Sequence, residues 1–177
     1  MKVRKGINRM LYIMRHGKTD WNEQHRLQGR TDIPLNENGI AMAKKAAEEY
    51  RDIHLDICYC SPLKRAEQTA RIVLSGRKTQ VPVVIDDRLM EMGFGEYEGV
   101  QNSFNISDCN VNVLFRNPER TGQFLDEVIQ PELAKGRDIL IVGHGAMNSS
   151  IICQIRGKTY AHFWDEGIEN CRLKRLI

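Results

Sequence analysis

Two short apolar segments of this chain each lead into a histidine that lies next to glycine. Met10–Met14 precedes Arg15-His16-Gly17, and Ile139–Val142 precedes Gly143-His144-Gly145. Short apolar runs bounded by glycine are typical of buried strands in a parallel sheet. Ligands of open α/β sheets bind beyond the carboxyl ends of the strands, where both histidines are expected to lie. Two imidazoles and an arginine at one point indicate a phosphate site, although either histidine alone would be interpreted as a polar residue that ends a strand.

Strand-like and helix-like segments alternate along the chain. Asn36 is a candidate N-cap for a first helix, Ser61-Pro62 is a typical start for a second, and Pro131 is expected to kink a third. Gly76 and Gly157 are expected to end helices. This alternation predicts an α/β fold, a three-layer sandwich with a mostly parallel central sheet. The expected helices span residues 36–51, 61–75, 119–135 and 146–156, the expected strands span 10–14, 55–60, 81–85, 139–142 and 171–177, and residues 86–117 are expected to be irregular.

Composition limits the class of protein. The chain has 177 residues, which is most simply one domain, and its net charge of +3 comes without a dense Lys/Arg block. These features give little support to nucleic-acid binding. No apolar stretch approaches the length that crosses a bilayer, and the five cysteines form no C-x-x-C pair. We therefore expect a cytoplasmic protein with reduced cysteines that binds neither membrane nor nucleic acid.

Arg65 and Glu91 are further candidates for the same site. Arg65 falls in the first turn of the helix expected after Ser61-Pro62, where free backbone amides favour an anion and a guanidinium can bind two phosphate oxygens. Glu91 stands between methionines, and burial of its carboxyl group would favour the protonated form that a general acid needs. The simpler alternatives are a surface arginine and an ordinary loop glutamate. Basic residues near these segments could attract an anionic substrate; they are Arg15, Lys18, Arg26, Arg30, Lys64 and Arg65.

Five segments occur in an order and spacing that are typical of one protein family. They are Arg15-His16-Gly17-Lys18-Thr19-Asp20-Trp21-Asn22, then Gln28-Gly29, Ser61-Pro62-Leu63-Lys64-Arg65-Ala66, Glu91 with Phe94-Gly95-x-x-Glu98-Gly99, and Gly143-His144-Gly145. Together they resemble the histidine phosphatase superfamily, branch 1, the phosphoglycerate-mutase-like group. The resemblance runs through nearly the whole chain and implies a single domain over residues 1–177.

The resemblance implies a metal-independent phosphomonoester hydrolase that acts on a small phosphorylated metabolite through a phosphohistidine. His16 would attack phosphorus, and Glu91 would protonate the departing oxygen and then deprotonate water, which releases inorganic phosphate. Arg15, Arg65 and His144 would bind the equatorial oxygens, so neither a metal nor a cofactor is expected. The five histidines also show no metal-ligand spacing. The remaining residues implied for the phosphate pocket are Asn22, Gln28, Gly29 and Gly145.

Two alternatives to a phosphatase stay open. Phosphoglycerate mutases belong to the same family, but the compact Gly93–Gly99 segment is typical of its phosphatases, and Ala146 stands where mutases tend to have asparagine. The second alternative is a phosphate-binding pseudoenzyme or partner-docking protein. It arises because the expected cap region, about residues 99–137, is shortened, with Arg120–Phe124 in place of a Gly-Glu-Ser-like motif. All five catalytic-type positions are filled, which favours the enzyme, and a homodimer is compatible with the sequence.

Overall fold

A five-stranded sheet forms the centre of the part of the chain that the structure describes. This computed structural model describes residues 9–101, 111–159, 162–163, 165 and 167–177, excluding the side chains of residues 111–117. The strand order is β3-β2-β4-β1-β5. Strands β1 (Leu11–Arg15), β2 (Ile57–Cys60), β3 (Val83–Ile85) and β4 (Ile139–Gly143) are parallel, whereas β5 (Leu173–Arg175) pairs antiparallel with β1 at one edge. The predicted mostly parallel sheet is therefore confirmed.

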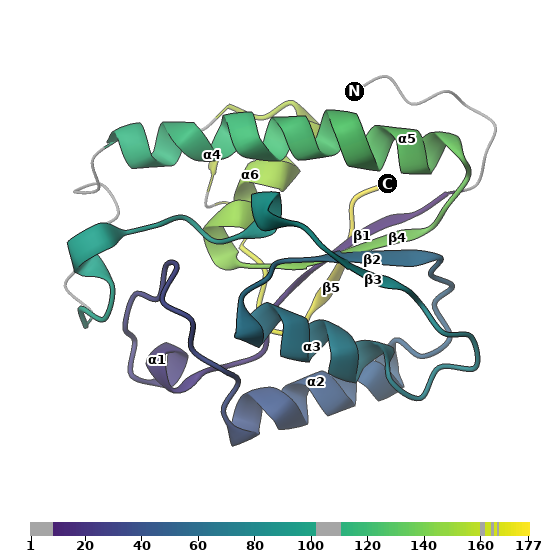
Figure 1. Cartoon of the computed structure of the whole chain (residues 1–177), viewed down its shortest axis with the longest axis horizontal. Helices are drawn as coiled ribbons and strands as arrows, with labels where there is room; N and C mark the ends of the chain where they lie inside the picture. Colours follow the sequence, from purple (N-terminus) through teal and green to yellow (C-terminus); the bar gives the residue numbers. More distant parts are fainter. Residues whose placement is uncertain (1–8, 102–110, 160–161, 164, 166) are drawn as a thin grey trace.

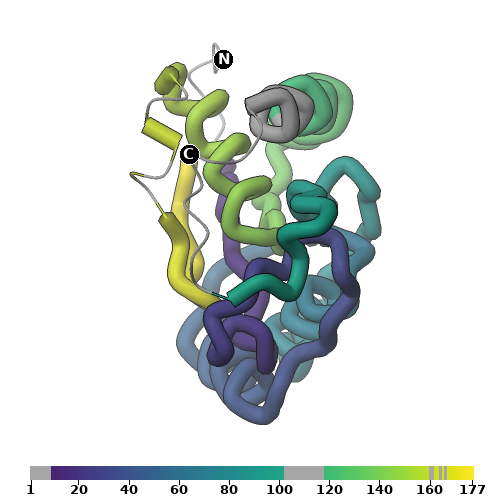
Figure 2. Tube along the Cα trace, turned by 90° about the vertical axis from the view of Figure 1, so that its left-hand side faces the viewer, coloured from purple at the N-terminus to yellow at the C-terminus, as the bar shows by residue number. Residues whose placement is uncertain are grey.

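Helices cover both faces of the sheet and give the predicted three layers (Figure 1). Helices α2 (Glu37–Glu49) and α3 (Lys64–Leu74) lie on one face, and α4 (Val111–Phe124), α5 (Gln130–Ala134) and α6 (Gly145–Arg156) lie on the other. Figure 2 shows the same layers from the side, with β5 in yellow along one edge. A short helix, α1 (Asp20–Glu23), follows β1 and was not expected.

Alternating side chains along each strand divide the core into two clusters. Toward α2 and α3, the strand residues Cys58, Cys60, Leu140 and Val142 pack against small helix residues, Ala43, Ala46, Ala66 and Ala70. Because alanines add little bulk, these two helices approach the sheet and each other closely. Toward α4–α6, the strand residues Leu11, Ile13, Ile139 and Ile141 pack against larger ones, Phe124, Ile129, Met147 and Ile151.

The predicted helix boundaries are right at Asn36 and Gly157 and wrong at Ser61. The Asn36 side chain accepts a hydrogen bond from the Gly39 backbone N–H at 2.9 Å and caps α2. Gly157 ends α6 in the left-handed conformation at φ 62°. Helix α3 begins only at Lys64, after an uncapped Leu63. The Ser61 hydroxyl instead contacts a histidine, described below, and its hydrogen bond with the Leu63 N–H is a long one at 3.3 Å.

The predicted helix over residues 119–135 is longer and less regular than expected. It begins at Val111, so residues 111–117, predicted irregular, are helical, whereas residues 102–110 lie outside the described part. It is interrupted by one wide π-helical segment, η4 (Leu125–Ile129), in which the Gln130 N–H bonds to the Leu125 carbonyl. The interruption falls just before Pro131, which has no N–H to continue the ladder. Within residues 86–101, two short 3₁₀ helices form, η1 (Asp87–Leu89) and η2 (Gly95–Tyr97).

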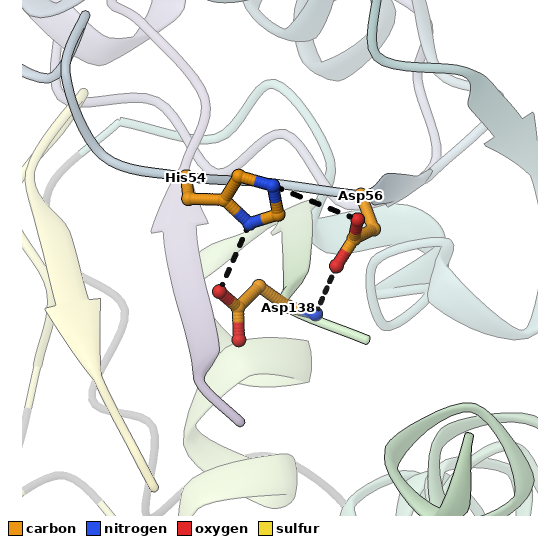
Figure 3. A group of neighbouring side chains, drawn as sticks. All are labelled: His54, Asp56 and Asp138. Carbon is orange, nitrogen blue, oxygen red and sulfur yellow. Dashed lines mark hydrogen bonds and ion pairs between the residues drawn. The ribbon is translucent and has the colours of Figure 1, made fainter. Parts of the chain in front are cut away.

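His54, Asp56 and Asp138 meet where β2 and β4 begin, at the opposite end of the strands from the two histidine loops (Figure 3). His54 Nδ1 lies 3.1 Å from Asp138 Oδ2, and the Asp138 N–H donates to Asp56 Oδ2 at 2.7 Å. The other Asp138 oxygen accepts the Met10 N–H at 2.6 Å. These contacts join the starts of three strands, so we assign the group a structural role. Histidine spacing could not have predicted the group, because its members come from separate segments.

Candidate active site

His16 and His144 lie side by side at the carboxyl ends of two neighbouring strands. Arg15 at the end of β1 pairs with Gly143 at the end of β4, so the residues that follow them leave the sheet together. The ring centroids of His16 and His144 are 5.2 Å apart, with an angle of 56° between the rings. Both side chains are buried, with exposed fractions of 3% and 0%. A small anion that reaches one imidazole therefore also reaches the other.

The loop that carries His16 is held at several points. The His16 N–H donates to the Gly143 carbonyl at 2.9 Å, and the Asn170 amide donates to the His16 carbonyl at 2.7 Å. The Gly17 N–H donates to Thr69 Oγ1 on α3 at 2.9 Å. A Cβ at Gly17 would lie 2.7 Å from the Gly39 carbonyl oxygen, so only glycine lets the start of α2 pack against this loop. The position of His16 is thus fixed before any substrate binds.

Hydrogen bonding determines which nitrogen of His16 can act as a nucleophile. Nδ1 lies 2.7 Å from the Gly17 carbonyl oxygen, which can only accept, so Nδ1 carries the hydrogen. In the neutral ring, the lone pair is then on Nε2. Burial, followed by the positive charges of Arg65 and Arg15, holds the pKa of His16 well below its usual value. The neutral, nucleophilic imidazole is therefore the stable form near neutral pH.

His144 has one ring nitrogen bonded to Ser61 and one without a partner among the described residues. Its Nε2 lies 2.8 Å from the hydroxyl of Ser61, which follows β2. Its Nδ1 is buried and has no hydrogen-bond partner among the described residues. Burial and the charges of Arg65, His16, Arg15 and Arg120 lower the pKa of His144 as well.

Arg65 is fully buried rather than on the surface of α3. Its two terminal nitrogens donate to the carbonyls of Gly29 at 2.7 Å and Thr31 at 2.9 Å. Burial lowers the pKa of Arg65 to about 10, and the nearby Glu91 charge opposes this change. The guanidinium therefore stays charged at neutral pH. Arg15 is partly buried, and a Cβ at Gly145 would lie 3.6 Å from Arg15 Cζ, which places this guanidinium over the first turn of α6.

Three buried nitrogen atoms around the histidines have no hydrogen-bond partner in the described part of the chain. They are Arg15 Nε, Arg65 Nε and His144 Nδ1. The two arginine nitrogens are donors, and His144 Nδ1 is one when Nε2 accepts the Ser61 hydroxyl. A buried donor without a partner costs about 1–3 kcal/mol. An anion between these residues would accept hydrogen bonds from them and remove that cost. The arrangement is therefore suited to a phosphate group.

Glu91 lies at the start of α6, with surroundings that differ from those expected. Its Oε1 accepts the N–H groups of Met147 at 2.9 Å and Met92 at 3.0 Å, and its Oε2 accepts the Ala146 N–H at 3.1 Å. The sequence suggested an apolar setting, but backbone amides at a helix N-terminus surround the carboxylate. A Cβ at Gly145 would lie 3.7 Å from Glu91 Oε2 and 3.6 Å from Arg15 Cζ, so the carboxylate and that arginine meet beside Gly145.

The segment from Asn22 to Thr31 forms one wall next to Arg65. Asn22 completes a capping box with Thr19, the N-cap of α1, and Thr19 Oγ1 donates to Gln28 Oε1 at 2.9 Å. Gly29 adopts φ +54° and supplies a carbonyl to Arg65, as described above. Asn22 and Gln28 thus bond to Thr19, and the direct contact of this segment with the arginine comes from backbone carbonyls.

Sequence reasoning missed several residues that hold this site in place. Glu98 holds the Asn22–Thr31 segment next to residue 94, because its side-chain oxygens accept the N–H groups of Arg30, Thr31 and Phe94 at 2.9, 2.9 and 3.0 Å. After burial and the charges of Arg65, His16 and Arg15, the charge of Arg120 on α4 also lowers the pKa of His144. Ser61, Glu98 and Arg120 all lie in segments that the sequence had singled out, but their partners are far away in the chain. The other missed residues are Thr69 and Asn170.

Because the pKa of His16 is lowered, we expect kcat/KM to fall only at an unusually low pH on the acid side of its pH profile. Because protonation of Nε2 removes the lone pair and the pKa is depressed, kcat/KM should stay constant as the pH falls through about 6.5, the ordinary imidazole value. It should decline only at lower pH. The measurement is a pH profile of kcat/KM, corrected for the substrate's own phosphate ionisation. An acid limb centred at or above the ordinary value would contradict the prediction.

Comparisons with known proteins show the family of this chain. The model of the histidine phosphatase superfamily, branch 1, matches residues 11–109 and 117–177. The uncharacterized phosphatase PhoE of Bacillus subtilis is 35% identical over 151 residues, 82% of this chain and 76% of that protein. The 2,3-bisphosphoglycerate-dependent phosphoglycerate mutase of Cytophaga hutchinsonii is 29% identical over 153 residues, 77% of this chain and 72% of the mutase.

Solved structures of phosphatases share the fold. The alpha-ribazole phosphatase of Shigella flexneri superposes with a TM-score of 0.79 at 26% identity, covering 94% of this chain and 89% of that one. The phosphoserine phosphatase of Entamoeba histolytica, in complex with 3-phosphoglyceric acid, gives a TM-score of 0.79 at 26% identity, covering 95% and 90%. The predicted family and the predicted phosphatase class are thus confirmed. This chain belongs to branch 1 of the histidine phosphatase superfamily.

Proposed function

We propose that this protein hydrolyses small phosphomonoesters through a phosphohistidine on His16 without a metal ion. The observation that carries the proposal is the set of buried nitrogens without partners, on Arg15, Arg65 and His144, around a neutral imidazole whose Nε2 is available. Donors placed in advance stabilise the charge that develops on the equatorial oxygens during phosphoryl transfer. We also propose that residues 1–177 form one domain, in which the region near residues 99–137 caps the site.

In the first step, the lone pair of His16 Nε2 attacks phosphorus opposite the leaving oxygen. The bond between phosphorus and that oxygen breaks, and its electron pair stays on the oxygen. Glu91, protonated at that stage, supplies the proton that makes the leaving group a neutral alcohol. Nδ1 keeps its hydrogen and donates it to the Gly17 carbonyl oxygen, which stabilises the positive charge on the phosphorylated ring.

In the second step, water attacks phosphorus and Glu91, now a carboxylate, takes the water proton. The bond between Nε2 and phosphorus breaks, its electron pair returns to the imidazole, and inorganic phosphate leaves. The compact Gly93–Gly99 segment supports hydrolysis rather than mutase chemistry, because a mutase must keep its phosphohistidine dry between half-reactions.

The pseudoenzyme alternative has less support. The five residues proposed for catalysis are present, and Arg15, Arg65 and His144 each keep a buried nitrogen without a hydrogen-bond partner among the described residues. A docking protein would have no need for buried donors that await an acceptor.

Metal removal tests the proposal. Hydrolysis of an aryl phosphate should continue at an unchanged rate after treatment with EDTA, because Arg15 and Arg65 supply the positive charge and His144 adds a hydrogen bond. Vanadate, which adopts the five-coordinate geometry of the transition state, should inhibit. Loss of activity with EDTA and its return with Mg²⁺ would overturn the metal-independent mechanism.

The proposed substrate is a small phosphorylated metabolite in the cytoplasm. Two of the similar phosphatases are named for small compounds, alpha-ribazole and phosphoserine. In the described part of the chain, the cysteines Cys58, Cys60, Cys153 and Cys171 are free thiols, which supports a reducing compartment. Cys109 lies outside the described residues. Within the described residues, no helix is both long enough and apolar enough to cross a membrane. A homodimer stays a prediction.

A further inference from the structure

Ser61, which the mechanism above does not use, lies against His144 at the carboxyl end of the sheet. Cys60 at the end of β2 pairs with Val142 of β4, and the Ser61 N–H continues this pairing by donating to the Val142 carbonyl at 3.2 Å. The next strand residue of β4 is Gly143, and His144 follows it. The side chains of Ser61 and His144 are both fully buried, and the serine hydroxyl lies 2.8 Å from His144 Nε2. Two neighbouring parallel strands therefore bring this hydroxyl to the imidazole.

The contact between Ser61 and His144 is compatible with two arrangements of hydrogen. Burial, ahead of the neighbouring positive charges, holds the pKa of His144 well below its usual value, so near neutral pH the ring carries one hydrogen. In the first arrangement, Nε2 accepts the Ser61 hydrogen and the ring hydrogen is on Nδ1. In the second, Nε2 donates to Ser61 Oγ and a lone pair is on Nδ1.

The other hydrogen bonds of Ser61 favour the first arrangement. Its Oγ also accepts from the Leu63 N–H at 3.3 Å, and within the described residues His144 Nε2 is the acceptor that remains for its hydrogen. The second arrangement would leave both the buried hydroxyl hydrogen and His144 Nδ1 without partners among these residues. The first leaves only the Nδ1 hydrogen, which a phosphate oxygen can accept.

The two histidines of the site then present opposite chemistry to a phosphate group. The Gly17 carbonyl can only accept, so it keeps the hydrogen of His16 on Nδ1 and leaves a lone pair on Nε2. The Ser61 hydroxyl donates to Nε2 of His144 and leaves an N–H at Nδ1. Different partners thus turn two imidazoles with centroids 5.2 Å apart into a nucleophile and a hydrogen-bond donor.

We infer that Ser61 is a positioning residue that keeps the hydrogen of His144 on Nδ1, so that this nitrogen donates to an equatorial phosphate oxygen. The inference rests on the proposed function, in which the phosphate lies beside both histidines. Ser61 itself contacts neither phosphorus nor the leaving group and acts through His144. Without the hydroxyl, nothing keeps the hydrogen on Nδ1, and a lone pair there repels the anion.

NMR of the ring nitrogens in isotope-labelled enzyme measures the position of this hydrogen directly. His144→Ala assigns the His144 signals by their loss. At neutral pH, wild-type His144 should carry its hydrogen on Nδ1, and in Ser61→Ala the hydrogen should move at least partly to Nε2. A wild-type ring with its hydrogen on Nε2 would overturn the inference, whatever the variants do.

Loss of the Ser61 hydroxyl should also weaken binding of phosphate-like anions. In Ser61→Ala, kcat/KM for an aryl phosphate should fall and the inhibition constant of vanadate should rise, each by about tenfold to a hundredfold, the value of a hydrogen bond to a charged group. Ser61→Thr keeps the hydroxyl and should recover most of the loss, whereas Ser61→Cys, with a weakly donating thiol, should recover less. Because Ser61 acts through His144, Ser61→Ala should cost less than about twofold in a His144→Ala background.

Ser75→Ala is the matched control, because it removes an exposed hydroxyl at the end of α3 that donates to the Ile72 carbonyl at 2.7 Å. This variant should keep the wild-type kcat/KM and vanadate inhibition. An equal loss from Ser61→Ala with and without His144 would contradict the inference while leaving the phosphatase proposal intact. If no phosphomonoester is hydrolysed, the proposed function fails instead. The His144 tautomer, with calorimetric binding of inorganic phosphate to wild type and Ser61→Ala, then decides the role of Ser61 alone.

Discussion

Replacing His16 with alanine is expected to reduce hydrolysis of every phosphomonoester by at least about 10⁴-fold, since the proposed mechanism has its side chain accept the phosphoryl group. Nε2 of His16 is the available ring nitrogen, whereas His144 has its Nε2 bonded to Ser61. In acid-quenched or base-quenched wild-type enzyme, the bound phosphate should be labile in acid and stable in base. No such phosphate should form in His16→Ala.

The control for this prediction is His54→Ala. His54 is 73% exposed and lies at the other end of the sheet, so its loss removes an imidazole without touching the site. Circular dichroism and thermal unfolding show whether His16→Ala, which empties a buried position, still folds. Labelling that persists in a folded His16→Ala variant would assign the nucleophile to another residue.

Local sequence signals predicted the layers and most elements of the fold. Apolar runs marked β1, β2 and β4 because these strands are buried on both faces, and Asn36 and Gly157 marked helix ends because their conformations are chemically specific. Ser61 gave a wrong helix boundary: a serine before proline is a common helix start, but here its hydroxyl bonds to His144, which follows β4. A contact across 83 residues leaves no trace in the local pattern.

The proposed site could be predicted where motifs carry the chemistry and not where distant residues support it. His16 and His144 could be expected to meet, because the carboxyl ends of parallel strands share one edge of a sheet. The burial of Arg65 could not, because it depends on the Gly29 and Thr31 carbonyls that a separate loop brings to it. Two of the amides around Glu91 were equally hidden, since they belong to α6, and the methionines next to Glu91 suggested an apolar environment instead.

Glu91 is the residue whose proposed role most needs a direct test. If it protonates the leaving oxygen, its removal should matter more as the leaving group becomes poorer. General acid catalysis is typically worth about a hundredfold to ten-thousandfold. Phosphorylation of His16 by alkyl phosphates should therefore slow by that order in Glu91→Gln, beyond any loss seen with activated aryl phosphates. Burst or single-turnover kinetics isolate this first step, because Glu91 also serves as the base in the second.

The comparison between substrates is essential because Glu91→Gln also disturbs structure. Both carboxylate oxygens accept backbone N–H groups at the start of α6, and a glutamine must turn its own NH₂ toward one of them. That damage lowers the rate for alkyl and aryl phosphates alike, whereas the missing proton slows only the poor leaving group. Glu98→Gln supplies the matched control, since Glu98 holds the wall loop through backbone N–H groups and should affect both substrates equally. An equal first-step loss in Glu91→Gln would reduce Glu91 to a positioning residue, and a selective loss in Glu96→Gln would then assign the proton donor to the exposed Glu96.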